Sequence, residues 1–540
     1  MSINTLDSRL GGILAPCSLR TARGNLGIRN PQSAIHNRAA GGAPLAAFLV
    51  AAIASSALPA ADQPQWGQRF TRNMVSAERG LPDSFDPAAG RNVKWSAALG
   101  TETNGSPIVA AGAVLVGTNR AAAGDGRHRG DRGVLMCFGQ ADGKLRWQLV
   151  VPKLEDDRFA DWHNVGIMSP PTVEGGRAYV VSNRGEVLCL DLAGLANGND
   201  GPYRDEGKHM AAAGKAPLAV EPSDADIVWR YDMRYTLGVR QHNGSNGSIL
   251  LHGRLLYVST SNGVDKSHRN IPAPDAPSLI VLDKATGRLV ATDKARMGPQ
   301  VFHGMWSSPS LGTVGGRELV FFGGGDGVCY AFEALTRPPA GTEPAALKNV
   351  WRFHCDPAGR SDNPHQYHNN RRESPSTIIG MPVFHDGRIY VTAGGDAWHG
   401  KRQAWLKCID ASKAGDVTGS AGLWSYPLNR HCLATPSVSG GLVYATDLGR
   451  VVHCVDAATG KPCWTHKAGG EIWSSTLVAD GKVYVGSRRG DFWILAAGRE
   501  KRVIHTARFA SGINTTATAA GGVLYVATNR RLYAIARTKD

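Results

Sequence analysis

The sequence lacks the short motifs by which many enzyme classes are recognised. Its 540 residues contain no Cys-x-x-Cys, no Cys-x-x-Cys-His and no adjacent pair of cysteines. They also contain no Gly-x-Ser-x-Gly and no His-Glu-x-x-His. These absences argue against a thioredoxin-like redox motif, a c-type haem, a serine hydrolase elbow and a zinc metalloprotease helix.

Charged residues are few, and basic residues outnumber acidic ones. Charged residues make up 19% of the chain, and the net charge is +15. Such an excess suits an acidic ligand or surface, although a solvated basic exterior is the commoner explanation. Nucleic acid is not expected as a partner, because no module that combines basic and aromatic residues is present.

Long apolar runs are missing except near the start. No charged residue occurs between Ala39 and Ala61, and Leu45–Ile53 forms an apolar core with small residues after it. This pattern predicts a secretory signal peptide over 1–61 with a long basic leader, and an uncleaved membrane anchor is the alternative. We therefore expect a periplasmic or secreted protein, monomeric and without a stable membrane span after cleavage.

What the sequence does contain is one phrase repeated eight times: a glycine turn followed by an apolar-aromatic strand. The copies begin at Gly112, Gly176, Gly253, Gly316, Gly387, Gly441, Gly481 and Gly522. The last three glycines are 40 and 41 residues apart, which is the length of one four-stranded propeller blade. Each unit also holds a strand that ends in Asp and, in most copies, a final tryptophan strand. The repeat predicts an all-β protein, an eight-bladed β-propeller of four-stranded antiparallel blades.

The two ends of the repeat region complement each other. The eighth copy stops at Ile535 without a tryptophan strand, and an orphan strand, Asn92–Trp95, precedes the first copy. This N-terminal strand is expected to complete the last blade and close the ring, which removes the open edge. The predicted organisation is an extended segment over 62–91 and the propeller over 92–540.

The cysteines fit the repeat. Aligning the third strands places Cys137, Cys189, Cys408 and Cys454 at a position that elsewhere holds Val281, Ala331, Ile494 and Ala534. A position that accepts Cys, Val, Ala and Ile is a small buried slot, so these thiols are expected to be inert. Cys329, Cys355, Cys432 and Cys463 are left without a predicted pairing.

The Asp-x-x-Thr-Gly-x-x-x-Trp ending, with the Ser-Pro and Gly-x-Val-Tyr-Val elements, resembles the pyrroloquinoline-quinone (PQQ)-like β-propeller repeat family over about residues 92–536. The resemblance implies that tryptophans near the blade ends dock against the neighbouring blade. The matching positions are Trp95, Trp147, Trp229, Trp351, Trp424 and Trp464.

The resemblance is compatible with two functions, redox catalysis and non-catalytic binding. The family includes quinoprotein dehydrogenases, which hold PQQ over a vicinal disulfide, against calcium and beside an aspartate, and it also includes non-catalytic propellers. This sequence has no adjacent cysteines and no match to that calcium set. No cofactor is therefore expected, and PQQ with calcium is the alternative.

A binding site is expected on the face where two sets of loops open, because both sets are rich in cations, imidazoles and amides. The predicted ligand-binding residues at the channel mouth are His163, Asn164, Arg240, His242, Asn243, His303, Trp306, Arg372, His431 and Trp473. No catalytic residue is predicted. A ring of such groups would focus positive potential on an anion.

Two hypothetical metal sites remain as alternatives to the prediction that the protein binds no metal. His163, His242, His303 and His431 could line one rim, but blades around a ring lie further apart than metal–nitrogen bonds allow unless neighbours converge. The oxygen-rich stretch 191–200 could hold calcium, although such clusters usually form turns.

The prediction is an exported, non-catalytic propeller that binds a protein partner or an anionic small molecule or glycan on its basic face. A divergent PQQ-dependent dehydrogenase that oxidises alcohols or sugars is the alternative. A hydrolase or lyase that acts on acidic polysaccharide is the third hypothesis and rests only on the charged face.

Overall fold

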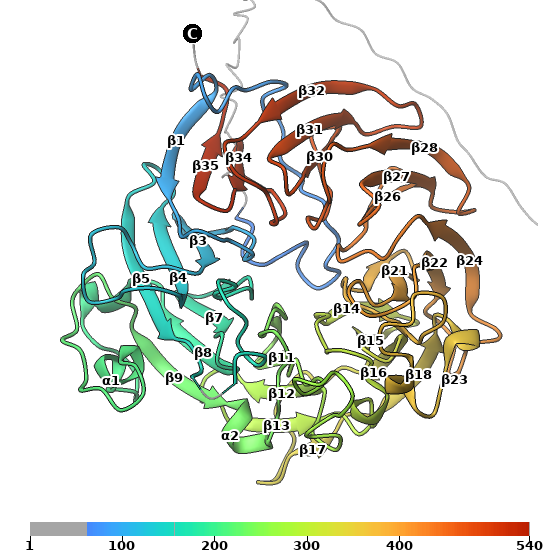
Figure 1. Ribbon diagram of the computed structural model, residues 1–540, viewed down its shortest axis with the longest axis horizontal. Coiled ribbons are helices and arrows are strands. Elements are labelled where there is room, and N and C mark those ends of the chain that lie inside the picture. The colour runs from blue at the N-terminus through green and yellow to red at the C-terminus, as the bar shows by residue number, and fades with distance from the viewer. Residues whose placement is uncertain (1–61, 156, 539–540) are drawn as a thin grey trace, which may run out of the picture. The chain divides into compact units, whose positions relative to one another are not determined.

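The computed structural model describes residues 62–155 and 157–538. Eight antiparallel sheets follow one another around a ring, which confirms the predicted eight-bladed propeller (Figure 1). The predicted signal peptide lies outside the described residues. Within the described ranges, no helix is both long and apolar enough to cross a membrane.

Blades 1 to 4 each run from a short inner strand to a longer outer one. Their strands are β2 (Ile108–Ala110), β3 (Ala113–Thr118), β4 (Arg132–Gly139) and β5 (Leu145–Pro152); β6 (Thr172–Glu174), β7 (Arg177–Val181), β8 (Glu186–Asp191) and β9 (Ile227–Asp232); β10 (Leu250–His252), β11 (Leu255–Ser259), β12 (Leu279–Asp283) and β13 (Leu289–Thr292); and β14 (Ser310–Val314), β15 (Arg317–Gly323), β16 (Val328–Glu333) and β18 (Asn349–His354).

Blades 5 to 8 repeat the pattern, and in blade 5 two short inner strands share the pairing with β21. Their strands are β19 (Ser376–Thr377), β20 (Val383–His385), β21 (Arg388–Gly395), β22 (Ala404–Asp410) and β24 (Gly422–Leu428); β25 (Ser437–Ser439), β26 (Leu442–Asp447), β27 (Val451–Asp456) and β28 (Pro462–Lys467); β29 (Leu477–Ala479), β30 (Lys482–Gly486), β31 (Asp491–Ala496) and β32 (Val503–Arg508); and β33 (Thr518–Ala520), β34 (Val523–Ala527), β35 (Arg531–Ile535) and β1 (Val93–Ala98).

The remaining elements are short and lie in inserted loops. Two parallel edge strands, β17 (Ala345–Ala346) and β23 (Gly415–Asp416), extend blades 3 and 4. The helices are α1 (Glu206–Met210) and α2 (Met233–Leu237), with single 3₁₀ turns η1 (Gly194–Asn197), η2 (Gly298–Gln300), η3 (Pro357–Gly359) and η4 (Pro364–Tyr367).

Strand β1 closes the ring as predicted. It pairs antiparallel with β35, so that Trp95 lies opposite Ala534. The last blade is therefore built from both ends of the described chain, and neither end leaves an unpaired outer strand.

The third-strand slot is a core position in every blade. Cys454, for example, lies between Tyr444 of the second strand and Trp464 of the fourth, and its side chain is buried. Cys137, Cys189 and Cys408 lie opposite Trp147, Trp229 and Trp424 in the same way. All eight cysteines of the described ranges are free thiols.

The six repeat tryptophans each link their own blade to the next one, at six of the eight blade junctions. Each indole Nε1 donates to a backbone carbonyl of the following blade, at 2.8 to 3.1 Å. Four of the rings also cover a turn glycine of that blade so closely that a Cβ atom there would collide with the indole. The donors and acceptors are Trp95 to Gln140, Trp147 to Leu192, Trp229 to Lys284, Trp351 to Ala411, Trp424 to Ala457 and Trp464 to Gly498.

Residues 62–81 form a hub that crosses the centre of the ring (Figure 1). The hub bonds to the inner strand or its entry loop in every blade, through Gln63 to Val109, Pro64 to Val173, Arg72 to Ser248, Phe70 to Leu311, Thr71 to Phe384, Asn73 to Val438, Met74 to Val478 and Ser76 to Ala519. Arg72 is fully buried, and burial lowers its pKa to about 9. Its guanidinium donates to the carbonyls of Trp66, Ser248 and Pro309, which ties the hub to blades 3 and 4.

Candidate functional site

A cavity of about 720 Å³ opens where the entry loops of several blades meet. Its floor includes Trp66 from the hub. Its lining residues are Trp66, Glu102, Asn104, Ser106, Phe159, Trp162, His163, Val165, Met168, Pro170, Asn243, Asn246, His268, His303, Trp306, Ile379, Trp398, His399, Leu433, Trp473, Arg488, Asn514 and Thr516.

Aromatic side chains and amides dominate this lining. Five tryptophans contribute to it, and Trp306 lies edge-on to Trp398 with ring centroids 5.7 Å apart. The side-chain oxygens of Asn243, Asn246 and Asn514 are buried without a hydrogen-bond partner within the described ranges. Flat apolar faces with a few unpaired polar atoms are typical of a small-molecule site.

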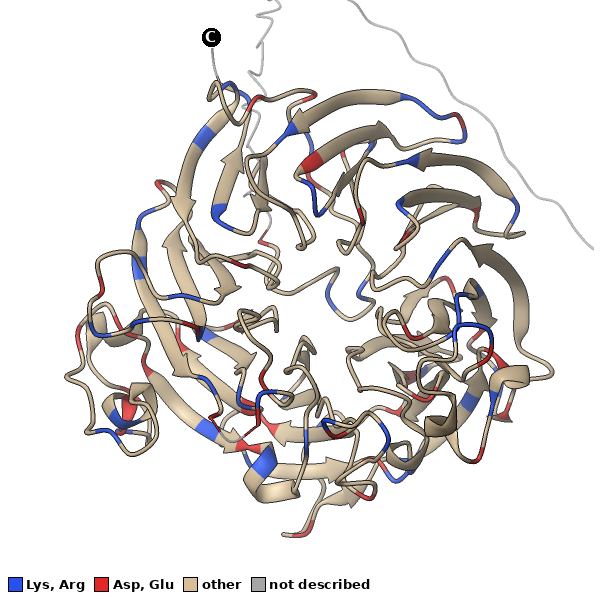
Figure 2. Ribbon diagram, in the orientation of Figure 1, with Lys and Arg blue, Asp and Glu red and all other residues tan. Residues whose placement is uncertain are grey.

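The cavity is much less basic than the sequence suggested. Arg488 is its only lysine or arginine, and this side chain stacks over Trp473 at 3.9 Å and lies 3.5 Å from Glu471. Other loop cations are engaged elsewhere, as Arg127 is with Asp125 and Asp224. Basic and acidic segments are interspersed around the ring (Figure 2). The predicted basic residues therefore do not converge on one anion site in the cavity.

Half of the predicted ligand-binding residues line the cavity, namely His163, Asn243, His303, Trp306 and Trp473. The other five do not. Asn164 and Arg372 are exposed on loops, and Arg240 lines a separate shallow depression beside Arg184. His431 is buried, with both ring nitrogens unpartnered in the described part of the chain.

His242, the fifth, lies directly beneath the cavity wall as part of a group of histidines. Five imidazoles from blades 3, 4 and 5 gather here, and adjacent ring centroids are 4.5 to 5.4 Å apart. The members of this histidine cluster are His242, His268, His303, His368 and His399. Neighbouring blades thus do converge, because inserted loops carry His268, His368 and His399 toward the two entry-loop histidines.

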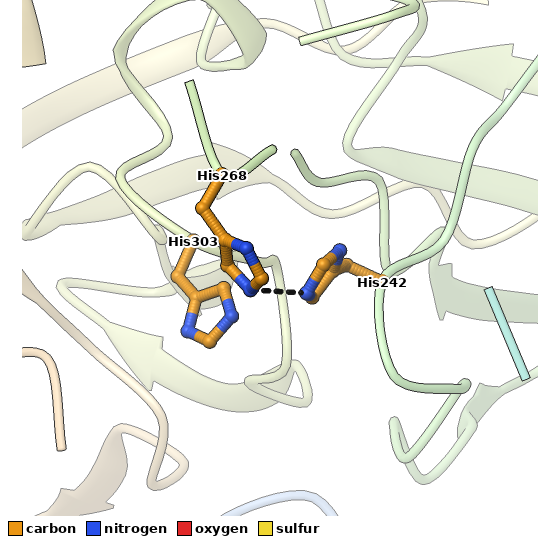
Figure 3. Close-up of side chains that lie close together, drawn as sticks. All are labelled: His242, His268 and His303. Atoms are coloured by element: carbon orange, nitrogen blue, oxygen red, sulfur yellow. Dashed lines mark hydrogen bonds between the residues drawn. The ribbon is translucent and has the colours of Figure 1, made fainter. Parts of the chain in front are cut away.

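The nitrogens of three cluster members point toward one another (Figure 3). One ring nitrogen from each of His242, His268 and His303 lies within 4.8 Å of the other two. The Nε2 atoms of His242 and His268 are 3.1 Å apart. The Nε2 of His303 is buried and has no hydrogen-bond partner among the described residues.

The opposite sides of two of these rings are held by acceptors. His242 Nδ1 is 2.7 Å from the Val264 carbonyl, and His303 Nδ1 is 3.0 Å from Asp396 Oδ2. Asp396 is buried and also accepts from the backbone N–H groups of Trp398 and His399. Burial alone would raise the pKa of Asp396, but the charge and hydrogen bond of His303 hold it below its usual range.

Burial favours the neutral form of three of the cluster imidazoles. Burial, with repulsion from His303 and His268, lowers the pKa of His242 to about 3. Burial and repulsion from His303 lower the pKa of His268 and of His399 to about 4 in each case. At neutral pH these rings therefore carry free lone pairs rather than charge.

Some of these residues are not among the predicted ligand-binding residues. His268, His399 and Trp398 lie in insertions of blades 3 and 5 that the sequence predicts only as part of the polar loop sets. Asp396 and Phe159 carry no motif at all. The usable signal was the count of histidines in the loops of three consecutive blades.

The oxygen-rich stretch 191–200 is occupied by a side chain of the protein. The carboxylates of Asp191, Asp200 and Asp226 lie within 4.8 Å of one another, but the Arg177 guanidinium pairs with the first two. This arrangement is a salt-bridged turn.

The cavity does not fit the PQQ–calcium pair of the quinoprotein dehydrogenases. Calcium takes six to eight oxygen ligands, usually with several carboxylates, whereas Glu102 is the only carboxylate in the lining. Arg488 alone would face the carboxylates of the quinone. Apart from Glu102, the donors among the described lining residues are mainly imidazoles and amides.

Comparisons with known proteins agree on the fold. The chain matches the family model described as outer membrane protein assembly factor BamB over residues 79–336 and 402–538. No curated protein matches the chain. Among solved structures, a europium-containing methanol dehydrogenase is 12% identical with a TM-score of 0.56, covering 88% of this chain and 98% of that one. The quinohemoprotein alcohol dehydrogenase of Comamonas testosteroni is 13% identical with a TM-score of 0.55, covering 89% and 81%.

Proposed function

Since the chain belongs to the PQQ-like propeller family whose model is described as outer membrane protein assembly factor BamB, we propose that it is an exported binding propeller. Its ligand is a small ring-shaped molecule with hydroxyl and carboxylate groups, such as an acidic sugar, which enters the tryptophan-lined cavity. Export rests on the apolar segment after Ala39.

The observation that carries this proposal is the pairing of indole faces with unsatisfied amide oxygens. Burying such oxygens without partners is unfavourable, by about 1–3 kcal/mol each, so a ligand whose hydroxyl groups donate to them would be stabilised in the cavity. The indoles offer large rigid contact area. Arg488 stacks over Trp473 and lies beside Glu471, and its guanidinium suits one carboxylate on the ligand.

A dehydrogenase role is disfavoured by the same lining. One carboxylate and one arginine do not provide the anionic cage and cationic clamp that calcium and quinone require. The proposal therefore favours binding over redox catalysis.

The test is a thermal-shift titration of the purified chain with uronic-acid oligosaccharides, neutral sugars, and PQQ with calcium. A ligand at 100 times its Kd adds about 2.7 kcal/mol of stability, so the acidic sugars should raise Tm. Trp473→Ala should abolish this shift. The matched control is Trp405→Ala, on the outer part of blade 5 under Lys401 and Lys407, which should keep it.

Two outcomes would contradict the proposal. Stabilisation by PQQ and calcium, together with oxidation of alcohols in the presence of a dye acceptor, would establish the dehydrogenase. Binding that is equal in wild type and Trp473→Ala would place the ligand outside the cavity and favour a partner on the rim.

A further inference from the structure

The histidine cluster has a geometry that a purely structural group does not need. Buried polar nitrogens normally find hydrogen-bond partners. Here His242 and His268 share one contact, and the buried Nε2 of His303 has none in the described ranges. One ring nitrogen from each of the three histidines thus faces one shared space (Figure 3).

The spacing of these atoms fits a bound ion. Two nitrogens that ligate the same tetrahedral ion at about 2.0–2.1 Å lie about 3.3 Å apart. The Nε2 atoms of His242 and His268 are 3.1 Å apart, and the third nitrogen lies within 4.8 Å of both. Because no two of these nitrogens are more than 4.8 Å apart, a side-chain shift of at most about 1.5 Å would complete the set.

The outer side of the cluster resembles that of known metal sites. Metal-binding histidines usually donate their other N–H to a carboxylate or a backbone carbonyl, which fixes the tautomer. Asp396 is the acceptor for Nδ1–H of His303, and the Val264 carbonyl is the acceptor for Nδ1–H of His242. Both contacts leave Nε2 as the atom that carries the lone pair.

We propose that His242, His268 and His303 bind a late first-row transition-metal dication, with zinc and copper as the best-fitting ions. Imidazole is a preferred ligand of both. This inference goes beyond the proposed binding function and stands on different residues.

The open side of this centre faces the cavity. His242 is fully buried, whereas His268, His303 and His399 line the cavity wall. The ring of His399 lies 5.0 Å from that of His303 and 4.5 Å from that of His368. The ion could therefore take His399 in its fourth position, which would close the site, or an oxygen of a bound ligand, which is the open arrangement of reactive zinc sites.

The test uses the purified full chain without a polyhistidine tag, stripped with a chelator and then titrated with Zn²⁺, Cu²⁺ and Co²⁺ against a chromophoric competitor. Wild type should bind one equivalent in the micromolar range or tighter. Bound Co²⁺ should show visible d–d bands of the strength expected for a tetrahedral nitrogen site. His268→Gln, on an inserted loop, should lose at least about 100-fold in affinity.

The matched control is His163→Gln, which changes an exposed histidine of the same cavity outside the cluster and should leave affinity unchanged. Equal losses in both variants, or wild type that binds no dication below about 100 µM, would overturn the proposal. If His268→Gln fails to fold by circular dichroism, the Co²⁺ spectrum and the stoichiometry of wild type decide the question.

Discussion

Two buried aspartate–histidine pairs lie in different parts of the ring, and they differ in the partner of the second imidazole nitrogen. In blade 6, His453 Nε2 bonds to Asp447 at 2.9 Å, and its Nδ1 is 3.1 Å from the Tyr426 hydroxyl. Beside blade 5, His303 Nδ1 bonds to Asp396 at 3.0 Å, but its Nε2 has no partner in the described ranges. The carboxylate is common to both pairs, and the second nitrogen alone separates a closed structural pair from an open one.

The difference arises in the loops rather than in the blades. Both regions are built on the same repeat, with the same core slot and the same tryptophan contacts. Blade 6 returns between its second and third strands by a tight turn, whereas the corresponding loop of blade 5 carries Trp398 and His399. Tyr426, the hydroxyl partner of His453, lies on β24, whereas the inserted loop of blade 5 brings the imidazole of His399 beside His303.

The largest effect should come from the part that the regions share. Trp351→Ala in blade 4 and Trp464→Ala in blade 6 should each lower the free energy of unfolding by about 3–5 kcal/mol, because each removes a buried indole and its hydrogen bond to the next blade. Urea unfolding monitored by circular dichroism measures both. A loss below about 1 kcal/mol in either variant would show that the docking contact is dispensable there.

Asp396→Asn and Asp447→Asn test the comparison directly. If the proposed metal centre exists, Asp396→Asn should weaken Zn²⁺ or Cu²⁺ binding by about 10–100-fold, since it changes the acceptor that orients His303. Asp447→Asn removes an equally buried carboxylate from His453 and should leave metal affinity unchanged. Competition titration on folded protein provides the measurement, and equal effects of the two substitutions would contradict the assignment.

Most of the fold could be predicted from the sequence because every copy of the repeat carries the same pattern of glycine turns and apolar strands. The number of blades follows from the eight copies of the repeat. The closure by Asn92–Trp95 follows from the strand that the eighth copy lacks. The hub over 62–81 could not be predicted, since it involves no motif and bonds to distant inner strands through backbone groups and the side chains of Arg72, Asn73 and Ser76.

The candidate site was predicted only in part for a related reason. His303 and Trp306 lie next to the repeat serine, so their position on the inner face follows from alignment. His268 and His399 sit in insertions of different lengths that the repeat does not align, and loop conformation depends on packing that a repeat does not encode. The predicted basic groups are not concentrated at the cavity: Arg127 and Arg184 pair with acidic neighbours outside it, and Arg488 lines it beside Glu471.

His431 offers a test in the entry loop of blade 6, where the imidazole is buried with no partner in the described ranges. Burial lowers its pKa to about 4, against about 6.5 in the unfolded chain. Between these values the unfolded state binds more protons, so stability falls as pH falls. From pH 7 to 5 this group should cost about 2 kcal/mol.

His431→Met should therefore lose about 2 kcal/mol less than wild type over the same pH range. Urea unfolding at pH 5, 7 and 8 measures the difference. Between pH 7 and 8 the two proteins should differ by a constant amount, because the ring is neutral in both states. An unchanged acid dependence would show that His431 gains a partner, such as water or a ligand, when protonated.

The smallest effect should come from the core slot of the same two blades. Burial raises the pKa of Cys408 to about 11 and that of Cys454 to about 12, so neither thiol should react with a disulfide reagent in native protein at pH 8. Cys408→Val and Cys454→Val should each change stability by less than about 1.5 kcal/mol, since valine fills the same slot in blade 3. Equal small effects, with metal affinity unchanged, would mean that blades 5 and 6 are interchangeable as scaffold and that their functions diverge only in the loops. A large loss confined to Cys408→Val would instead show that the cluster depends on strain transmitted from the core of blade 5.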